Sequence, residues 1–348
     1  MKHEKNLIYS TVAVILLIST VLALTGCGSG KSTGQPVNST TTTGSNITAS
    51  SIPAASVATT VPVGNGAAAI AYDSGKSEIF VANSGEETVT VISDSTNNVV
   101  ATIQLGTYPV SLAYDSGQGE VYAVSNVGGS VLVISDATNT VVATVTGLAA
   151  PPNNIVYDSG KGELFVSESS SPGSGAVDVI SDSSNKVVAS VPLNTGCTSL
   201  CYDAAKGEVF AADGYSNNVQ VISDSTNSIS ATLTISLYPG TIAYNPAKNE
   251  IFVSVSNAAA GLNVISDSNN NVKTVSMGIP GYYAYNSTKN ELYTGTANNT
   301  ISIITDSGAG KVVATLSGKV GPFVYDSGIG KIYVISPGNV VSVVTPAS

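Results

Sequence analysis

The groups in this sequence best able to bind a cation or transfer a proton are carboxylates at recurring positions. One set of aspartates ends an apolar run after tyrosine, a second set follows Ile-Ser or Ile-Thr, and a set of glutamates begins another apolar run. In that order, the sets are Asp73, Asp115, Asp158, Asp203 and Asp326; Asp94, Asp136, Asp182, Asp224, Asp267 and Asp306; and Glu78, Glu120, Glu163, Glu208, Glu250 and Glu291. Because Ca²⁺ prefers clustered carboxylate and carbonyl oxygens, one interpretation is calcium binding.

The second interpretation of the aspartates is turn chemistry. Asp, Asn and Ser side chains hydrogen-bond their own backbone and tolerate tight turns. Recurrence in almost every unit suits a folding role better than a single site. We therefore predict turn residues and no metal centre, with a structural calcium ion as the alternative. The glutamates are predicted to make a repeated structural contact rather than to act as a catalytic acid–base pair.

Other catalytic residue types are scarce. The single histidine is His3, and all 13 basic residues are lysines, with no arginine and no tryptophan. A Ser-His-Asp site and histidine-bound zinc or copper are therefore excluded from the rest of the chain. The formal net charge of −10 disfavours binding to nucleic acid, which depends on basic side chains at phosphates. We predict that the protein is not an enzyme and holds no cofactor.

Two cysteines, Cys197 and Cys201, have a spacing that invites comparison with a disulfide. In an extended strand, Cα atoms four residues apart are roughly 13 Å apart, whereas a disulfide needs about 4.4–6.8 Å. Cys201 also occupies the small apolar position that Ala71 and Ala113 hold in other units. We expect Cys201 to be a buried thiol, and a bridge from Cys197 would require the preceding loop to fold back.

These residues belong to a repeated unit. Seven tyrosines begin the shared motif at intervals of 40 to 45 residues: Tyr72, Tyr114, Tyr157, Tyr202, Tyr244, Tyr285 and Tyr325. Such a period is typical of a propeller or a solenoid. The first unit contains four β-rich runs separated by turn residues, at Ala68–Tyr72, Glu78–Ala82, Thr88–Ser93 and Val99–Ile103. Runs that are apolar on both faces must be covered on both sides, as in radially stacked blades.

The two ends of the repeat region complete each other. The last unit lacks a fourth strand, and residues 57–64 match the fourth strand of other units. We predict that residues 57–348 form an all-β, seven-bladed β-propeller of four-stranded antiparallel blades, with the last blade closed by the N-terminal strand. Closure would remove an open sheet edge that could pair with another chain.

The unit resembles the YVTN-type β-propeller repeat of archaeal surface-layer and other prokaryotic envelope proteins. The resemblance rests on degenerate tetrads such as Phe80-Val-Ala-Asn83 and Tyr333-Val-Ile-Ser336, and on the recurring Val-Ile-Ser-Asp and Val-Val-Ala-Thr segments. It covers essentially all of residues 57–348 and implies the fold rather than an activity, because one fold hosts many functions.

The region before the repeats resembles an export signal. Lys2 and Lys5 precede an apolar stretch over residues 7–24, and Leu24-Thr-Gly-Cys27 resembles a lipobox, which implies that Cys27 carries lipid. An uncleaved signal anchor is the alternative. Residues 1–27 are thus predicted to be a signal or membrane anchor. Residues 28–56, rich in Ser and Thr, are predicted to be a disordered tether. Candidate N-glycosylation sites are Asn38, Asn46, Asn286 and Asn298.

A ligand site is expected on the face opposite the aspartate turns, where the connecting loops differ between units. Variable loops on a rigid scaffold commonly carry binding residues. The candidates there are Tyr108, Tyr215, Tyr238, Tyr282 and Tyr283. We predict a non-enzymatic interaction, adhesion or cell-coat module, displayed on the outer face of the cell membrane, for protein or glycan partners. The alternatives are an extracellular enzyme using carboxylates or bound calcium, and a structural envelope spacer.

Overall fold

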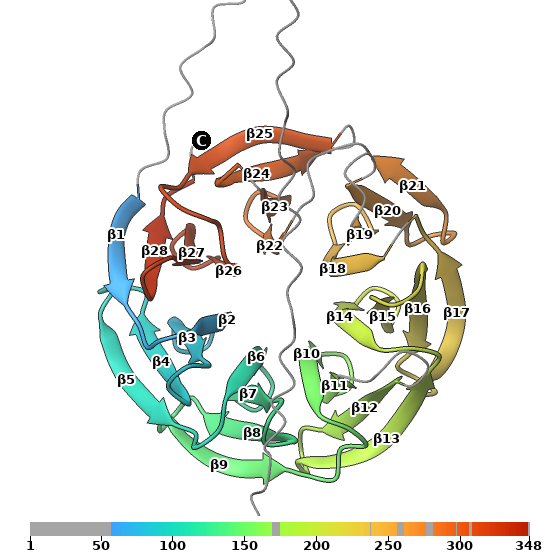
Figure 1. The fold of residues 1–348 in the computed structure, drawn as a ribbon, viewed down its shortest axis with the longest axis horizontal. Helices are drawn as coiled ribbons and strands as arrows, with labels where there is room; N and C mark the ends of the chain where they lie inside the picture. Colours follow the sequence, from blue (N-terminus) through green and yellow to red (C-terminus); the bar gives the residue numbers. More distant parts are fainter. Residues whose placement is uncertain are drawn as a thin grey trace, which may run out of the picture. The chain divides into compact units, whose positions relative to one another are not determined.

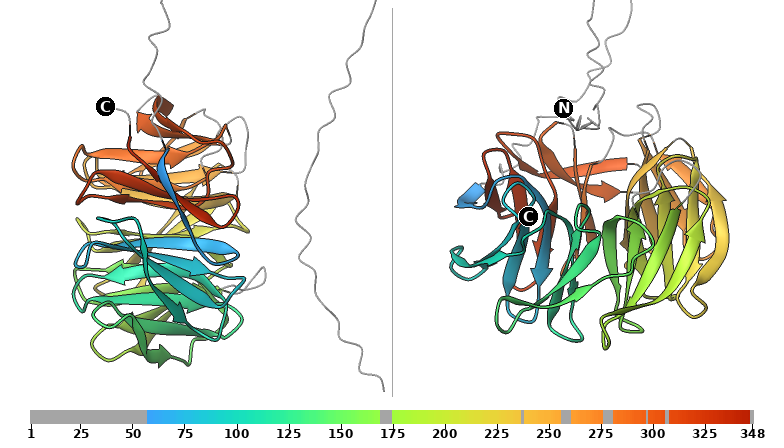
Figure 2. Two further views of the ribbon diagram at one scale, coloured as in Figure 1. Left: turned by 90° about the vertical axis from the view of Figure 1, so that its left-hand side faces the viewer. Right: turned by 60° about the horizontal axis from the view of Figure 1, so that its bottom comes forward.

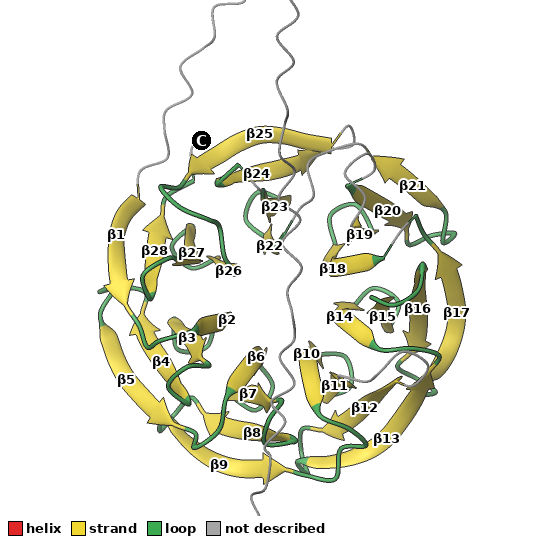
Figure 3. Cartoon of the chain, viewed as in Figure 1, coloured by secondary structure: helices red, strands yellow, loops and turns green. Residues whose placement is uncertain are grey.

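The computed structural model describes residues 57–346, apart from 169–174, 237, 256–260, 276–280, 297 and 306–307. The described residues form seven four-stranded antiparallel sheets, arranged as blades around a ring (Figure 1). Strands and loops make up the whole of this ring in Figure 3. None of the described residues lies in a helix long and apolar enough to span a membrane. The predicted all-β, seven-bladed propeller is confirmed.

Each blade runs from an inner strand to an outer strand. The inner strands are β2 (Ala67–Asp73), β6 (Pro109–Asp115), β10 (Pro152–Asp158), β14 (Cys197–Asp203), β18 (Pro239–Asn245), β22 (Tyr283–Asn286) and β26 (Phe323–Asp326). The second strands are β3 (Glu78–Asn83), β7 (Glu120–Ser125), β11 (Glu163–Glu168), β15 (Glu208–Asp213), β19 (Glu250–Val255), β23 (Glu291–Gly295) and β27 (Lys331–Ser336).

The third strands are β4 (Thr88–Ser93), β8 (Ser130–Ser135), β12 (Gly175–Ser181), β16 (Asn218–Ser223), β20 (Leu262–Ser266), β24 (Thr300–Thr305) and β28 (Val340–Val344). The outer strands are β5 (Val99–Gln104), β9 (Thr140–Val145), β13 (Lys186–Leu193), β17 (Ser228–Thr234), β21 (Val272–Val275), β25 (Gly308–Thr315) and β1 (Val57–Pro62). We number the blades 1 to 7 from β2–β5 to β26–β28, and blade 7 takes β1 as its outer strand.

The core lies between blades. The second and third strands are buried on both faces, as in β3 and β4, whereas the outer strand β5 is largely exposed. Seven clusters of buried apolar side chains are found, and each joins one blade to the next. The continuous apolar runs in the sequence are therefore explained by radial stacking, in which each blade covers the faces of its neighbours.

The N-terminal strand closes the ring. Strand β1 pairs antiparallel with β28, with Thr60 opposite Ser342 and Val61 opposite Val341. Val61 is buried in the apolar cluster between blade 7 and blade 1. In Figure 1, β1 lies beside the C-terminal strands, and Figure 2 shows the same pairing from the side. This arrangement gives the edge of β28 a partner, as predicted from the incomplete last repeat.

A repeated polar contact also ties each blade to the next. The Oδ1 atom of Asp73 accepts hydrogen bonds from the backbone N–H groups of Gly75 (2.8 Å) and Lys76 (3.0 Å). Asp115, Asp158 and Asp326 cap their turns in the same way. The Tyr114 hydroxyl group of blade 2 lies against Asp73 of blade 1, and burial followed by this contact raises the pKa of Tyr114. These aspartates therefore have the predicted turn role.

Candidate ligand-binding face

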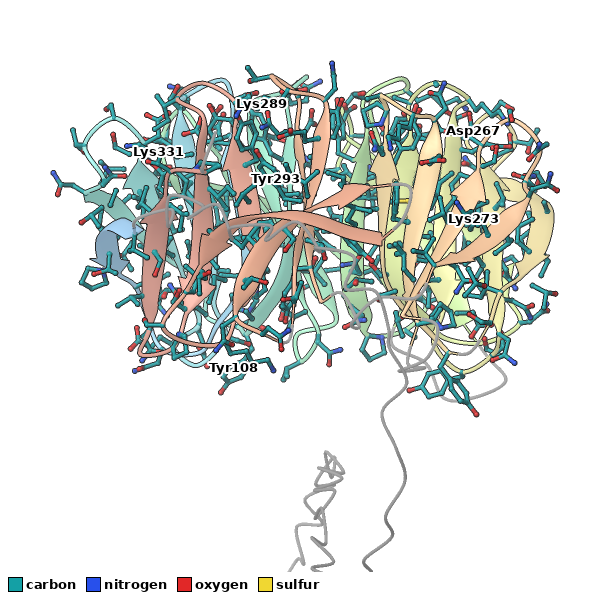
Figure 4. The ribbon with its side chains drawn as sticks, turned by 90° about the horizontal axis from the view of Figure 1, so that it is seen from above. Tyr108, Asp267, Lys273, Lys289, Tyr293 and Lys331 are labelled. Atoms are coloured by element: carbon teal, nitrogen blue, oxygen red, sulfur yellow. The ribbon has the colours of Figure 1, made fainter. Side chains whose placement is uncertain are left out.

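The connections lie on two opposite rims of the ring. The turns between first and second strands and between third and fourth strands share one rim, which we call the turn rim. The remaining loops form the loop rim. Figure 4 shows Asp267, Lys289 and Lys331 on the turn rim and Tyr108 on the opposite rim. The sequence predicted that the recurring turn residues and the loops that vary between units lie on opposite faces.

The carboxylates of the turn rim point into the structure rather than into solvent. Asp73, Asp115, Asp158, Asp203 and Asp326 are all fully buried. Each lies against the next blade, where an aspartate from a turn between third and fourth strands approaches it. Asp94 of blade 1, for example, faces Asp326 of blade 7, and burial followed by the charge of Asp326 raises the pKa of Asp94. The acidic turn rim is thus mainly a set of contacts between blades.

Three predicted tyrosines are exposed on the loop rim. Tyr108 lies in the loop between β5 and β6, Tyr215 between β15 and β16, and Tyr238 between β17 and β18, with exposed fractions of 41%, 55% and 53%. The hydroxyl group of Tyr108 hydrogen-bonds Glu87, and this contact raises the pKa of Tyr108. Tyr108 therefore also anchors its loop.

Tyr215 and Tyr238 are held on adjoining loops. Asp213 is buried and accepts hydrogen bonds from the backbone N–H of Tyr215 (3.1 Å) and from the Ser216 hydroxyl (2.6 Å). The backbone N–H of Tyr238 donates to Asn217 Oδ1 (3.3 Å), which lies in the loop that carries Tyr215. Tyr238 has a φ of 36°, a backbone conformation that a bulky residue rarely adopts. The two side chains thus project from fixed backbone.

Tyr282 and Tyr283 lie deeper. Both are partly buried, and Tyr282 packs against the apolar cluster between blades 6 and 7. The ring of Tyr283 packs against the cluster between blades 5 and 6, and its hydroxyl group is shielded from solvent. Burial strongly raises the pKa of Tyr283. These two tyrosines line the central channel instead of standing out from the rim.

The channel contains a cavity of about 320 Å³ at the ring axis. Residues from all seven inner strands or the loops before them line it, and every lining residue is uncharged. Its polar groups are linked across blades: Asn154 Oδ1 accepts from the Leu200 N–H (3.1 Å), and Ser199 Oγ accepts from the Ile242 N–H (3.4 Å). This lining offers hydroxyl, amide and aliphatic contacts, and no lining side chain can supply a carboxylate for acid–base chemistry.

A buried carboxyl pair in blade 3 was missed by sequence reasoning. Glu168 and Asp178 are 3% and 1% exposed, and burial together with their shared hydrogen bond raises the pKa of Glu168 to about 7. Glu168 Oε1 accepts a hydrogen bond from the backbone N–H of Ala150 (2.7 Å), and Asp178 Oδ2 accepts one from the backbone N–H of Ala149 (2.9 Å). The signal in the sequence was a glutamate where blades 1 and 2 have Asn83 and Ser125. Through these two hydrogen bonds the buried pair holds the loop between β9 and β10.

The cysteines are free thiols. Cys197 and Cys201 are both buried, and burial raises the pKa of Cys197 to about 12 and that of Cys201 further. The thiol of Cys197 donates to the Ser199 carbonyl oxygen (3.4 Å). The prediction of a buried thiol at Cys201 is confirmed, and a thiol with so high a pKa is a poor nucleophile.

The modification candidates fall into three groups. Cys27, Asn38 and Asn46 lie outside the described residues. Asn298 is exposed in the turn between β23 and β24. Asn286 is buried, with its Nδ2 donating to the Tyr293 hydroxyl (2.6 Å) and its Oδ1 accepting from the Thr288 N–H (3.0 Å). A glycan on Asn286 would require this turn to open.

Comparison with known proteins extends to the fold. No protein family model matches the chain, and no curated protein matches it. A Kuenenia stuttgartiensis hydrazine synthase structure is similar, with a TM-score of 0.71 and 17% identity over 81% of this chain and 96% of that one. The β-propeller domain of Myceliophteria thermophila Cps50 (Swd1) has a TM-score of 0.66 and 10% identity over 84% of this chain and 99% of that one. By its sheets and by these neighbours, the chain is a seven-bladed β-propeller.

Proposed function

We propose that this propeller is a non-enzymatic interaction module of the cell envelope, anchored outside the membrane by the N-terminal segment and binding a protein or glycan partner. The observation that carries the proposal is the pair Tyr215 and Tyr238, more than half exposed on backbone fixed by Asp213 and Asn217. Exposed aromatic rings on a rigid support lose little conformational freedom when they bind, which favours recognition.

The chemistry of the channel supports a binding role. Its lining is uncharged, and the buried carboxyl pair Glu168 and Asp178 is engaged by loop amides. The sequence has no histidine after His3 and no arginine, so neither a histidine general base nor an arginine anion clamp is available there. The Leu24–Cys27 motif and the resemblance to YVTN-type repeats supply the expected location.

The test is binding of the purified full chain to isolated envelopes of the source cells. Saturable, competable binding is expected, and Tyr215→Ala with Tyr238→Ala should weaken it at least about tenfold, as loss of a central aromatic contact does. Val127→Ser is the matched control, because Val127 is 74% exposed on the same rim but belongs to blade 2. Absence of binding, or equal loss in the control, would reject the proposed site.

A further inference from the structure

Three oxygen atoms recur at the interfaces between blades. They are Oδ2 of the aspartate that ends an inner strand, Oε2 of the glutamate that begins the second strand, and Oδ1 of an asparagine in the next blade's turn. In the interface between blades 4 and 5, these atoms belong to Asp203, Glu208 and Asn270. All three are buried, and none receives a hydrogen bond from the described residues. The same triple is unpartnered between blades 1 and 2 and between blades 3 and 4.

One aromatic position decides whether the glutamate and asparagine oxygens have a donor. Between blades 2 and 3, the hydroxyl group of Tyr122 lies within hydrogen-bond distance of both Glu120 Oε2 (3.1 Å) and Asn185 Oδ1 (2.8 Å), which share its one proton. Between blades 7 and 1, the Tyr333 hydroxyl group donates to Asn97 Oδ1 (3.0 Å). The aspartate oxygen has no donor in either of these interfaces. The three interfaces in which the whole triple is unpartnered have phenylalanine at this position: Phe80, Phe165 and Phe210. In the phenylalanine interfaces, the glutamate and asparagine oxygens therefore converge on the position that the tyrosine hydroxyl group occupies in the other interfaces.

Among the described residues, the interface between blades 4 and 5 is the place where three carboxyl groups come close enough together to hold a metal ion. One oxygen each of Asp203, Glu208 and Asp267 lie within 4.8 Å of one another. Asp203 is fully buried, and its Oδ1 already accepts the Ala205 N–H (2.8 Å). The hydroxyl group of Tyr244 has one proton, for which Asn249 Oδ1 (3.1 Å) and the facing Asp203 carboxylate compete. The second oxygen of Asp203 has no well-aligned hydrogen-bond donor among the described residues.

A lysine neutralises part of this charge. Lys206 Nζ lies 2.9 Å from Asp267 Oδ1, and the Lys206 side chain is 38% exposed. When all three carboxyl groups are ionised, one ammonium group leaves two negative charges uncompensated at a largely buried position, which is costly unless protons, a cation or further donors are supplied. A water molecule has two hydrogens and no charge, so it leaves that charge uncompensated.

We propose that the interface between blades 4 and 5 binds Ca²⁺ through Asp203, Glu208 and Asp267, with Asn270 Oδ1 as a neutral ligand. Calcium–oxygen bonds are about 2.3–2.6 Å, so two ligands of one ion are at most about 5.2 Å apart. The three carboxylate oxygens, all within 4.8 Å of one another, meet this condition. The ion would join β15 of blade 4 to the turn after β20 of blade 5. Its role is to hold the ring, whatever partner the loop rim binds.

Calorimetric titration of CaCl2 into the purified, metal-stripped full chain tests the site, together with the melting temperature with and without Ca²⁺. The wild-type chain should bind Ca²⁺ saturably, more tightly than Mg²⁺, and melt at a higher temperature with Ca²⁺. Glu208→Gln should weaken binding about tenfold or more. Phe210→Tyr, which places a hydroxyl group where Tyr122 has one, should weaken binding to a similar extent while the fold is kept.

Two further variants sharpen the result. Lys206→Gln removes the competing ammonium group and should tighten Ca²⁺ binding, and glutamine is the natural residue at this turn position in blade 2, Gln118. Glu163→Gln is the matched control in blade 3, and it should leave the high-affinity site unchanged. Absence of saturable Ca²⁺ binding, or an affinity unchanged by Glu208→Gln, would overturn the proposal. Should Phe210→Tyr fail to fold, Glu208→Gln alone decides.

Discussion

The hydroxyl group of Tyr114 occupies the space that a side chain on Gly75 would need, because a Cβ atom at Gly75 would lie 2.5 Å from it. The two residues belong to neighbouring blades. Gly117 and Gly160 stand in the same relation to Tyr157 and Tyr202, each at 2.7 Å. In these three turns the glycine therefore leaves room for the tyrosine of the next blade, whereas Ala205 and Ala247 take the corresponding position in blades 4 and 5.

Replacement of this glycine tests the contact. Gly75→Ala should destabilise the fold by about 1–3 kcal/mol, the usual effect of overpacking, because the Tyr114 hydroxyl must move away from Asp73. The denaturation midpoint measures the change. Gly281→Ala is the control, since a Cβ atom there meets its nearest neighbour at 3.9 Å. Equal effects of the two substitutions would show that the Tyr114 contact has no special importance.

Carboxyl pairs between blades predict a pH dependence. Burial, followed by the charge of the facing carboxyl group, raises the pKa of Asp94 beside Asp326 and that of Asp136 beside Asp73. Because the pKa of each group is higher in the folded state, its protonated form stabilises the fold. This stabilisation is fully present below the unfolded-state pKa of about 3.9 and is lost as pH rises through the folded-state pKa. The melting temperature, measured in EDTA, should therefore increase as pH falls from 7 towards 4.

Asp94→Asn isolates one of these pairs. The neutral amide removes the repulsion with Asp326 at pH 7, so the variant should be more stable than the wild type there and show a smaller gain on acidification. Thermal melts of both chains across pH 4–7 supply the comparison. An Asp94→Asn chain with an unaltered pH profile would contradict the assignment.

The carboxyl pair of blade 3 should control its loop near neutral pH. Burial and the hydrogen bond with Asp178 raise the pKa of Glu168 to about 7, so Glu168 is protonated below that pH. The stabilisation that the protonated pair gives to the fold is lost as pH rises through 7. Amide exchange at Ala149 and Ala150, which donate to the pair, should become faster above pH 7 beyond the intrinsic pH effect. In Glu168→Gln this additional acceleration should be missing, and its persistence would refute the mechanism.

Strand β1 should be required for a closed ring. Deletion of residues 1–62 removes the partner of β28 and the buried Val61 side chain, and it should cost at least about 3 kcal/mol and promote self-association. Melting temperature and light scattering report the two effects. A chain shortened only through residue 50 retains β1 and should behave as the full chain does. A monomeric 63–348 chain of unchanged stability would argue against closure by β1.

The sequence by itself determined the seven blades, the four strands of the first blade to within one residue at each end, and the split last blade. Thr88–Ser93 is predicted and observed with the same limits, because alternation, turn residues and repeat length are local properties of the chain. Likewise, turn chemistry correctly predicted the hydrogen bonds of Asp73.

The tertiary structure decided what lies between blades. Asp203 and Asp267 belong to successive blades and are more than one repeat apart, and nothing in their local sequence places their carboxylates together. The difference between Phe210 and Tyr122 is a conservative change in sequence, yet it determines whether buried oxygens have a donor. The exposure of Tyr215 and the depth of Tyr283 also depend on how the loops and inner strands curve around the channel, since stacking and twist, not periodicity, fix those positions.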